Sequence, residues 1–141
     1  MTAALSRSRP AARAAALAAA LALAACGRAG DDAVTLWHAY SGDERAALED
    51  EAARWNRDHP ERTVRLVAVP YDAFADKITS AIPNGNGPDL FVYSHDRVGD
   101  WVASGLLEPI EFWIDGDTAA TWADDALAAM AYRGSLWGLP L

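Results

Sequence analysis

The sequence predicts an α/β fold, with a mainly parallel sheet flanked by helices. Short runs of β-forming and apolar residues alternate with longer segments in which apolar residues recur at helical spacing. Their order is strand, helix, strand, helix, strand, helix, which is typical of parallel strands joined by helical crossovers. A chain of 141 residues with 52% hydrophobic content fits one domain of this class and can form a core.

The first strand and helix are expected near the start of this pattern. Residues 34–38 read VTLWH, a β-forming run without proline, and predict a strand. A helix is expected over 43–58, where Ser41 and Glu44 have the spacing of a capping box. The predicted buried stripe of this helix lies at i, i+4 and i+7: Leu48, Ala52 and Trp55.

A second strand and helix follow. Residues 63–69 predict a strand in which Val64, Leu66 and Ala68 alternate with Thr63, Arg65 and Val69. Asp72 is then expected to cap a helix over 73–82. Three apolar residues share one face of that helix: Phe74, Ile78 and Ile82.

The third strand and helix surround the most informative stretch of the chain. Residues 90–93 form an apolar run that predicts a buried strand, and a helix is expected over about 97–104, ended by Gly105. The following residues predict a short extended piece at 106–110, a helix at 121–130 and a hairpin that turns at Arg133-Gly134.

The spacing of the six tryptophans indicates a place for two of them. Trp55 and Trp101 fall at helical positions that predict the core. For Trp37 and Trp137 both core packing and a platform for sugar stacking remain open.

The first 32 residues predict export and a membrane anchor. Residues 1–25 contain arginines, a short apolar run and a final Leu-Ala-Ala before Cys26, as in a signal peptide that ends in a lipobox. Cys26 is therefore expected to carry lipid, and 26–32 to be a tether. The alternative is an ordinary signal peptide cut nearby, with an incidental free thiol. The domain is expected over 33–141.

Charge and motifs exclude several classes of function. The formal net charge of −8 disfavours nucleic-acid binding, because an acidic surface repels phosphates. His38, His59 and His95 lack metal-ligand spacing, and the sequence has no nucleophile elbow or phosphate loop. We therefore expect no cofactor, no metal and no catalytic constellation.

Three residues at the end of the third predicted strand form the main candidate site. Tyr93, Asp96 and Arg97 supply an aromatic ring, a carboxylate and a guanidinium at the edge of the sheet where ligands collect. Such a set can stack on a sugar ring and both accept and donate hydrogen bonds. The structural alternatives are a core tyrosine, an aspartate helix cap and a solvated arginine; His95 is expected to be structural.

Residues 85–110 also carry a family resemblance. Their Gly-x-Gly-Pro-Asp, apolar strand, His-Asp-Arg and Ser-Gly-Leu-Leu resemble the maltose/maltodextrin-binding type of extracellular solute-binding protein, which serves ATP-driven sugar importers. The resemblance runs from about residue 34 to residue 141. It implies a two-lobed periplasmic-binding-protein fold of type II, of which this chain would be the first part of the N-terminal lobe, an N-terminal fragment without the second lobe.

The resemblance also implies ligand contacts beyond the main cluster. The family uses the loop after the first strand, here Tyr40 and Ser41, although this loop is about one residue longer than in the maltose binder. An acidic pair on the second helix of the family appears here as Ala75-Asp76, which leaves Asp76 as the candidate. These departures suggest a different sugar or chain length.

The expected function is that of an exported, lipid-anchored, monomeric carbohydrate receptor that delivers its ligand to the permease subunits of an ABC transporter. The site residues would be Tyr93, Asp96, Arg97, Tyr40, Ser41 and Asp76. A secreted lipoprotein enzyme that acts on glycans is the alternative, and a surface lipoprotein with protein contacts alone is a third. As a fragment, the chain would bind sugar weakly or fold poorly.

Overall fold

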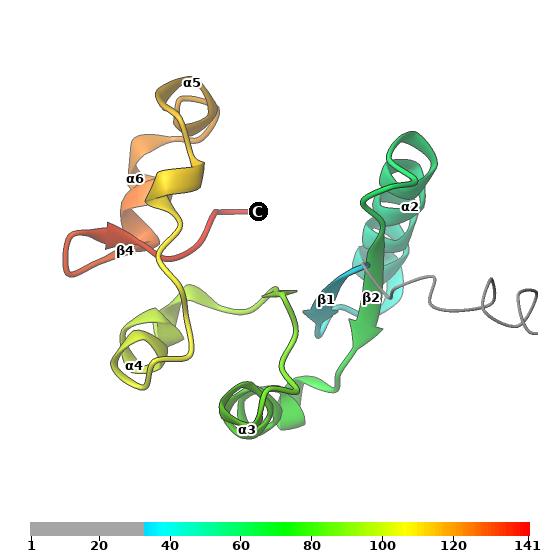
Figure 1. Ribbon diagram of the computed structural model, residues 1–141, viewed down its shortest axis with the longest axis horizontal. Coiled ribbons are helices and arrows are strands. Elements are labelled where there is room, and N and C mark those ends of the chain that lie inside the picture. Colours follow the sequence, from blue (N-terminus) through cyan, green and yellow to red (C-terminus); the bar gives the residue numbers. More distant parts are fainter. Residues whose placement is uncertain (1–32) are drawn as a thin grey trace, which may run out of the picture. The chain divides into compact units, whose positions relative to one another are not determined.

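The structure contains a three-stranded parallel sheet with the strand order β2-β1-β3. β1 spans Val34–His38, β2 Val64–Ala68 and β3 Leu90–Phe91. The arrows of β1 and β2 point the same way in Figure 1. The predicted parallel α/β architecture is therefore confirmed.

The computed structural model describes residues 33–141. The predicted signal peptide (1–25), the lipid-attachment residue Cys26 and the tether (26–32) lie outside the described residues.

Helices follow each of the three strands. α2 spans Gly42–Asp58, α3 Tyr71–Ala81 and α4 Val98–Ala103, and a 3₁₀ turn at His95–Arg97 leads into α4. Gly105, with φ of 67°, lies just beyond the end of α4, in the left-handed conformation that glycine adopts without strain. All three predicted helices are confirmed, with bounds shifted by no more than two residues.

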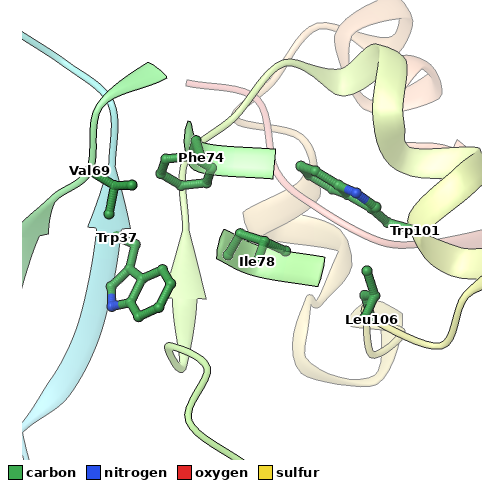
Figure 2. Close-up of a cluster of buried hydrophobic side chains, with 6 residues drawn as sticks. All are labelled: Trp37, Val69, Phe74, Ile78, Trp101 and Leu106. Atoms are coloured by element: carbon green, nitrogen blue, oxygen red, sulfur yellow. The ribbon is translucent and has the colours of Figure 1, made fainter. Parts of the chain in front are cut away.

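The core forms where α3 packs between the sheet and α4. Its buried hydrophobic side chains are Trp37, Val69, Phe74, Ile78, Trp101 and Leu106. Figure 2 shows Phe74 and Ile78 on α3 between Trp37 of β1 and Trp101 of α4. Phe74 and Ile78 are fully buried, as the apolar face predicted for this helix requires. The prediction that Trp101 lies in the core is also confirmed.

The Gly-x-Gly-Pro-Asp loop fixes β3 against β1. Gly85 has φ of 70° and ends a 3₁₀ turn at Ile82–Asn84. The Asp89 carboxylate accepts a hydrogen bond from the Thr35 backbone N–H at 2.7 Å, and the Asp89 N–H donates to the Thr35 carbonyl. The motif thus aligns β3 with the central strand, and it positions the residues that follow β3.

The predicted buried stripe on α2 is wrong at Trp55. This side chain is 44% exposed, and α2, all of whose residues are described, buries no side chain fully. The Trp55 ring lies 4.0 Å from the His59 ring, and its Nε1 donates to the Arg62 carbonyl. Trp55 therefore packs on the turn after α2 rather than in the core.

The capping predictions also need correction. Ser41 occupies the N-cap position of α2, but its side chain makes no capping hydrogen bond. At α3 the N-cap is Pro70, and Asp72 lies in the first turn instead of preceding it. An acidic residue in a first turn still favours a helix through its charge, because the helix N-terminus carries a partial positive charge.

Two strand predictions are wrong in detail. β3 is shorter than predicted and its Leu90 is 54% exposed, so it is not a strand buried on both faces. Alternation breaks at the end of β2, where Ala68 is exposed and Val69 is buried. The reason is that Val69 lies beyond the strand, in the connection to α3, and joins the core there.

The remaining residues form short elements. After a 3₁₀ turn at Glu111–Trp113 come α5 (Gly116–Ala119), α6 (Asp124–Ala129) and the antiparallel strands β4 (Ala131–Tyr132) and β5 (Ser135–Leu136). The hairpin turns at Arg133 and Gly134, both with positive φ, as predicted. The helix predicted over 121–130 is shorter than expected, and residues 106–110 form no strand.

Candidate ligand-binding site

The strand order places a topological switch point at the carboxyl ends of β1 and β3. From β1 the chain goes to β2 on one side and later to β3 on the other. The Val92 N–H donates to the Trp37 carbonyl at 2.9 Å, so these two strand ends are adjacent. In parallel α/β sheets, ligands bind in the region beyond the carboxyl ends of the strands at such a point. The loops that leave it are 39–41 and 92–97.

Tyr93 lies at this edge, supported by an aromatic cluster. Its ring centroid is 5.1 Å from that of Phe74, 5.4 Å from that of Tyr71 and 5.2 Å from that of Trp101. The rings of Tyr71 and Phe74 are nearly parallel to it, at 12° and 22°. Tyr93 is therefore both a site candidate and a half-buried member of the hydrophobic packing.

Asp96 and Arg97 lie in the 3₁₀ turn directly after this ring, and both side chains are exposed. The pKa of Tyr93 is raised, first by a hydrogen bond with the Tyr71 side chain and then by burial. Among smaller effects, Arg97 lowers this pKa and Asp96 raises it, so both charges act on the Tyr93 hydroxyl. The three predicted residues of the main cluster are therefore close together.

The other predicted site residues are more dispersed. Tyr40 is half-buried, with its ring 6.1 Å from that of His38, and Ser41 is exposed at the start of α2. Asp76 is exposed on α3. Within residues 33–141, no hydrogen bond, ion pair or ring contact links Tyr40, Ser41 or Asp76 to the cluster at 93–97. Tyr40 and Ser41 lie at the same edge of the sheet as that cluster, because their loop follows β1.

Sequence reasoning missed two aromatic side chains at this edge. Tyr71, the first residue of α3, is 62% exposed and stacks on Tyr93. The sequence could have indicated Tyr71 as a site residue. It is an aromatic residue after Pro70 and follows β2, at the edge where the other two strands also end.

His38, the last residue of β1, is the second. It is 1% exposed, and its Nδ1 has no hydrogen-bond partner among the described residues. Burial lowers the pKa of His38, and Arg45 lowers it further, whereas Glu49 raises it. Burial thus favours the neutral form of the imidazole at the end of β1.

No group of metal-ligating side chains occurs within the part of the chain that the structure describes. In the same residues, none of the helices is long and apolar enough to cross a membrane.

The fold and this edge together define a class: an α/β binding module whose polar and aromatic side chains gather at the carboxyl ends of a parallel sheet. A family model described as bacterial extracellular solute-binding protein matches residues 39–140. The chain belongs to the bacterial extracellular solute-binding protein family.

Relatives within the curated proteins agree with this assignment. The chain is 32% identical over 111 residues to a maltotriose-binding protein of Pyrococcus abyssi, an alignment that covers 79% of this chain and 24% of that protein. It is 24% identical over 123 residues to an uncharacterized lipoprotein of Streptomyces antibioticus, covering 84% of this chain and 27% of that one.

Solved structures show the same similarity. The Thermus thermophilus maltotriose-binding protein, solved with maltotriose, has a TM-score of 0.69 and 30% identity, over 75% of this chain and 28% of that chain. A protein solved with mannotriose bound has a TM-score of 0.71 and 27% identity, over 77% and 28%. The chain spans about a quarter of the length of the relatives it matches.

Proposed function

We propose that this protein is an extracytoplasmic carbohydrate receptor that binds an oligosaccharide and delivers it to an ATP-driven importer. The observation that carries the proposal is the family match over 39–140, because that range includes both loops that leave the switch point. Binding, not turnover, is the proposed activity. The family is one of solute-binding proteins, and the Pyrococcus and Thermus relatives are named for binding maltotriose.

An oligosaccharide is the ligand class that the relatives support best. Maltotriose and mannotriose are the sugars named for two solved structures. Their glucose and mannose units differ in the orientation of a single hydroxyl group.

The side chains at 93–97 have the chemistry that such a ligand needs. Asp96 can accept hydrogen bonds from sugar hydroxyls, and Arg97 can donate to sugar oxygens through its planar fork. Both are exposed, and within residues 33–141 neither has a hydrogen bond or ion pair to another side chain. We propose ligand contacts also for Tyr93, Tyr40 and Ser41, and for Asp76 at the periphery.

Binding is tested by saturation-transfer difference NMR on the purified chain, because this method detects weak as well as moderate affinity. Maltotriose, mannotriose and a galacto-oligosaccharide are each added, with sorbitol as a polyol control. We expect transfer to at least one sugar and none to sorbitol. Absence of transfer to every sugar, with circular dichroism showing a folded chain, would overturn the proposal.

The same samples separate receptor from enzyme. Chromatography after overnight incubation is expected to recover the sugar unchanged. Release of shorter sugars would favour a glycan-degrading enzyme instead.

We further propose that the mature protein is monomeric and anchored to the membrane by lipid on Cys26. The support is the lipobox sequence and the similarity to a Streptomyces lipoprotein. Cells that express the protein are labelled with an alkyne fatty acid. We expect label in the wild type, found in the membrane fraction, and none in Cys26→Ser. Equal labelling of both would contradict the anchor, and a dimer mass in light scattering would contradict the monomer.

A further inference from the structure

The ring of Tyr93 has little free aromatic face. Three aromatic rings pack around it, two of them nearly parallel to it, and it is half-buried. Stacking with a pyranose needs an accessible ring face about the size of the sugar. Tyr93 in this arrangement is better suited to support another ring than to offer its own.

Tyr71 has the exposure that Tyr93 lacks. Its side chain is 62% exposed although it is stacked on Tyr93 at 5.4 Å and 12°. Tyr93 is its only ring contact among the described residues. One face of Tyr71 is therefore backed by an aromatic ring, and most of the residue is exposed to solvent.

The aromatic stack also restrains Tyr71. Tyr93 rests on Phe74, which is fully buried in the core, and on Trp101 of α4. Restraining a side chain in its binding orientation before the ligand arrives reduces the entropy lost on binding.

The position of Tyr71 agrees with such a role. Tyr71 begins α3 just after β2, at the carboxyl-terminal edge of the sheet, and through Tyr93 it adjoins Asp96 and Arg97. An open aromatic face next to an acceptor and a donor suits a ligand with both C–H surfaces and hydroxyl groups.

We propose that Tyr71, backed by Tyr93, presents the aromatic face on which a pyranose ring of the ligand stacks. The inference rests on the proposed carbohydrate-binding function and names a residue of that same site. It assigns the Tyr93 ring a supporting role and leaves only the Tyr93 hydroxyl for the ligand contact proposed above.

The test compares Tyr71→Leu, which keeps apolar bulk but removes the ring, with Tyr71→Phe, which keeps the ring and removes the hydroxyl. Phe112→Leu is the matched control, since Phe112 is an exposed aromatic residue (85%) in the 3₁₀ turn at Glu111–Trp113. Dissociation constants are measured by NMR titration with the sugar that gives the strongest saturation transfer to the wild type.

We expect Tyr71→Leu to weaken binding by about three- to tenfold, the range of an aromatic stacking contribution. Tyr71→Phe and Phe112→Leu are expected to stay within about twofold of the wild type. Saturation transfer to the axial C–H protons of the sugar should also fall in Tyr71→Leu alone.

The outcomes separate the two proposals. If the wild type binds sugar and Tyr71→Leu binds equally well, the Tyr71 inference is wrong and the receptor proposal stands. Equal weakening in Tyr71→Phe and Tyr71→Leu would assign the effect to the hydroxyl, and this too overturns stacking. If the folded wild type binds no sugar, the receptor proposal itself fails. Thermal melting of each variant monitors folding, which an exposed side chain should affect little.

Discussion

His38 couples the stability of the fold to pH. Its imidazole is buried at the end of β1, next to Tyr40, and the charges of Arg45 and Glu49 of α2 act on it. Burial, and secondarily Arg45, lower the pKa of His38 in the folded state. In the unfolded chain it returns to about 6.5. Below that pH the unfolded state binds a proton that the folded state resists, so acid favours unfolding.

We expect the free energy of unfolding to fall as pH decreases from about 6.5 toward the folded-state pKa, by up to about 1.4 kcal/mol per pH unit. His38→Gln should remove this contribution and flatten the dependence. The measurement is urea unfolding between pH 7.5 and 5. His95→Gln, which removes an exposed imidazole, serves as the control. An unchanged pH dependence in His38→Gln would contradict the role of His38.

Gly87 is required by close packing. A Cβ at this position would lie 2.6 Å from Ile82 Cγ1 and 3.0 Å from Ile82 Cα. The second contact is with backbone, which cannot rotate away. We expect Gly87→Ala to destabilise the fold by about 1–3 kcal/mol, as overpacking does. In Gly116→Ala, by contrast, the added Cβ would have no atom within 4 Å. Equal melting temperatures for the two variants would show that the loop adjusts freely.

At the scale of elements, α2 and α3 differ in how much they contribute to the core. Phe74 of α3 is fully buried, whereas the largest side chain of the expected stripe on α2, Trp55, is 44% exposed. We expect Phe74→Ala to cost about 3–5 kcal/mol. Trp55→Phe removes mainly the hydrogen bond to the Arg62 carbonyl and should cost about 1 kcal/mol. Urea unfolding measures the loss for Trp55→Phe, and circular dichroism in buffer is expected to show Phe74→Ala largely unfolded. A folded Phe74→Ala that is more stable than Trp55→Phe would reverse this ranking.

The same two helices show what the sequence could predict. Helical spacing located both elements to within one or two residues, because spacing depends on local geometry. Burial depends on what packs against a face, so identical spacing predicted a core position correctly for Phe74 and wrongly for Trp55. The cluster at 93–97 could be predicted because it is local in the chain. The stacking of Tyr71 on Tyr93 could not, since it joins the ends of β2 and β3, which are not adjacent in the sheet.

The whole described unit has a small core. Six hydrophobic side chains are buried in residues 33–141, while Leu90, Phe112 and Trp113 remain exposed. We expect a free energy of unfolding at or below about 5 kcal/mol, the low end for natural domains. Urea unfolding followed by tryptophan fluorescence measures it. A value near 10 kcal/mol would contradict this, and would show that contacts other than those of the six buried side chains contribute much of the stability.

Low stability makes the whole molecule responsive to its ligand. A ligand that binds only the folded state adds RT ln(1 + [L]/Kd), which is about 1.4 kcal/mol at ten times Kd. For a unit of this size that raises the melting temperature by roughly 5 °C or more. We expect this shift with the oligosaccharide that gives saturation transfer, growing with the logarithm of its concentration. Sorbitol at the same mass concentration controls for the general stabilisation by polyols, which acts through exclusion from the protein surface.

The variant Asp96→Asn locates the sugar. Asp96 is exposed, whereas Tyr93 is part of the packing, so the substitution should leave the melting temperature without sugar unchanged. It should abolish the shift that sugar produces in the wild type. A shift that persists in Asp96→Asn would place the sugar elsewhere on the molecule.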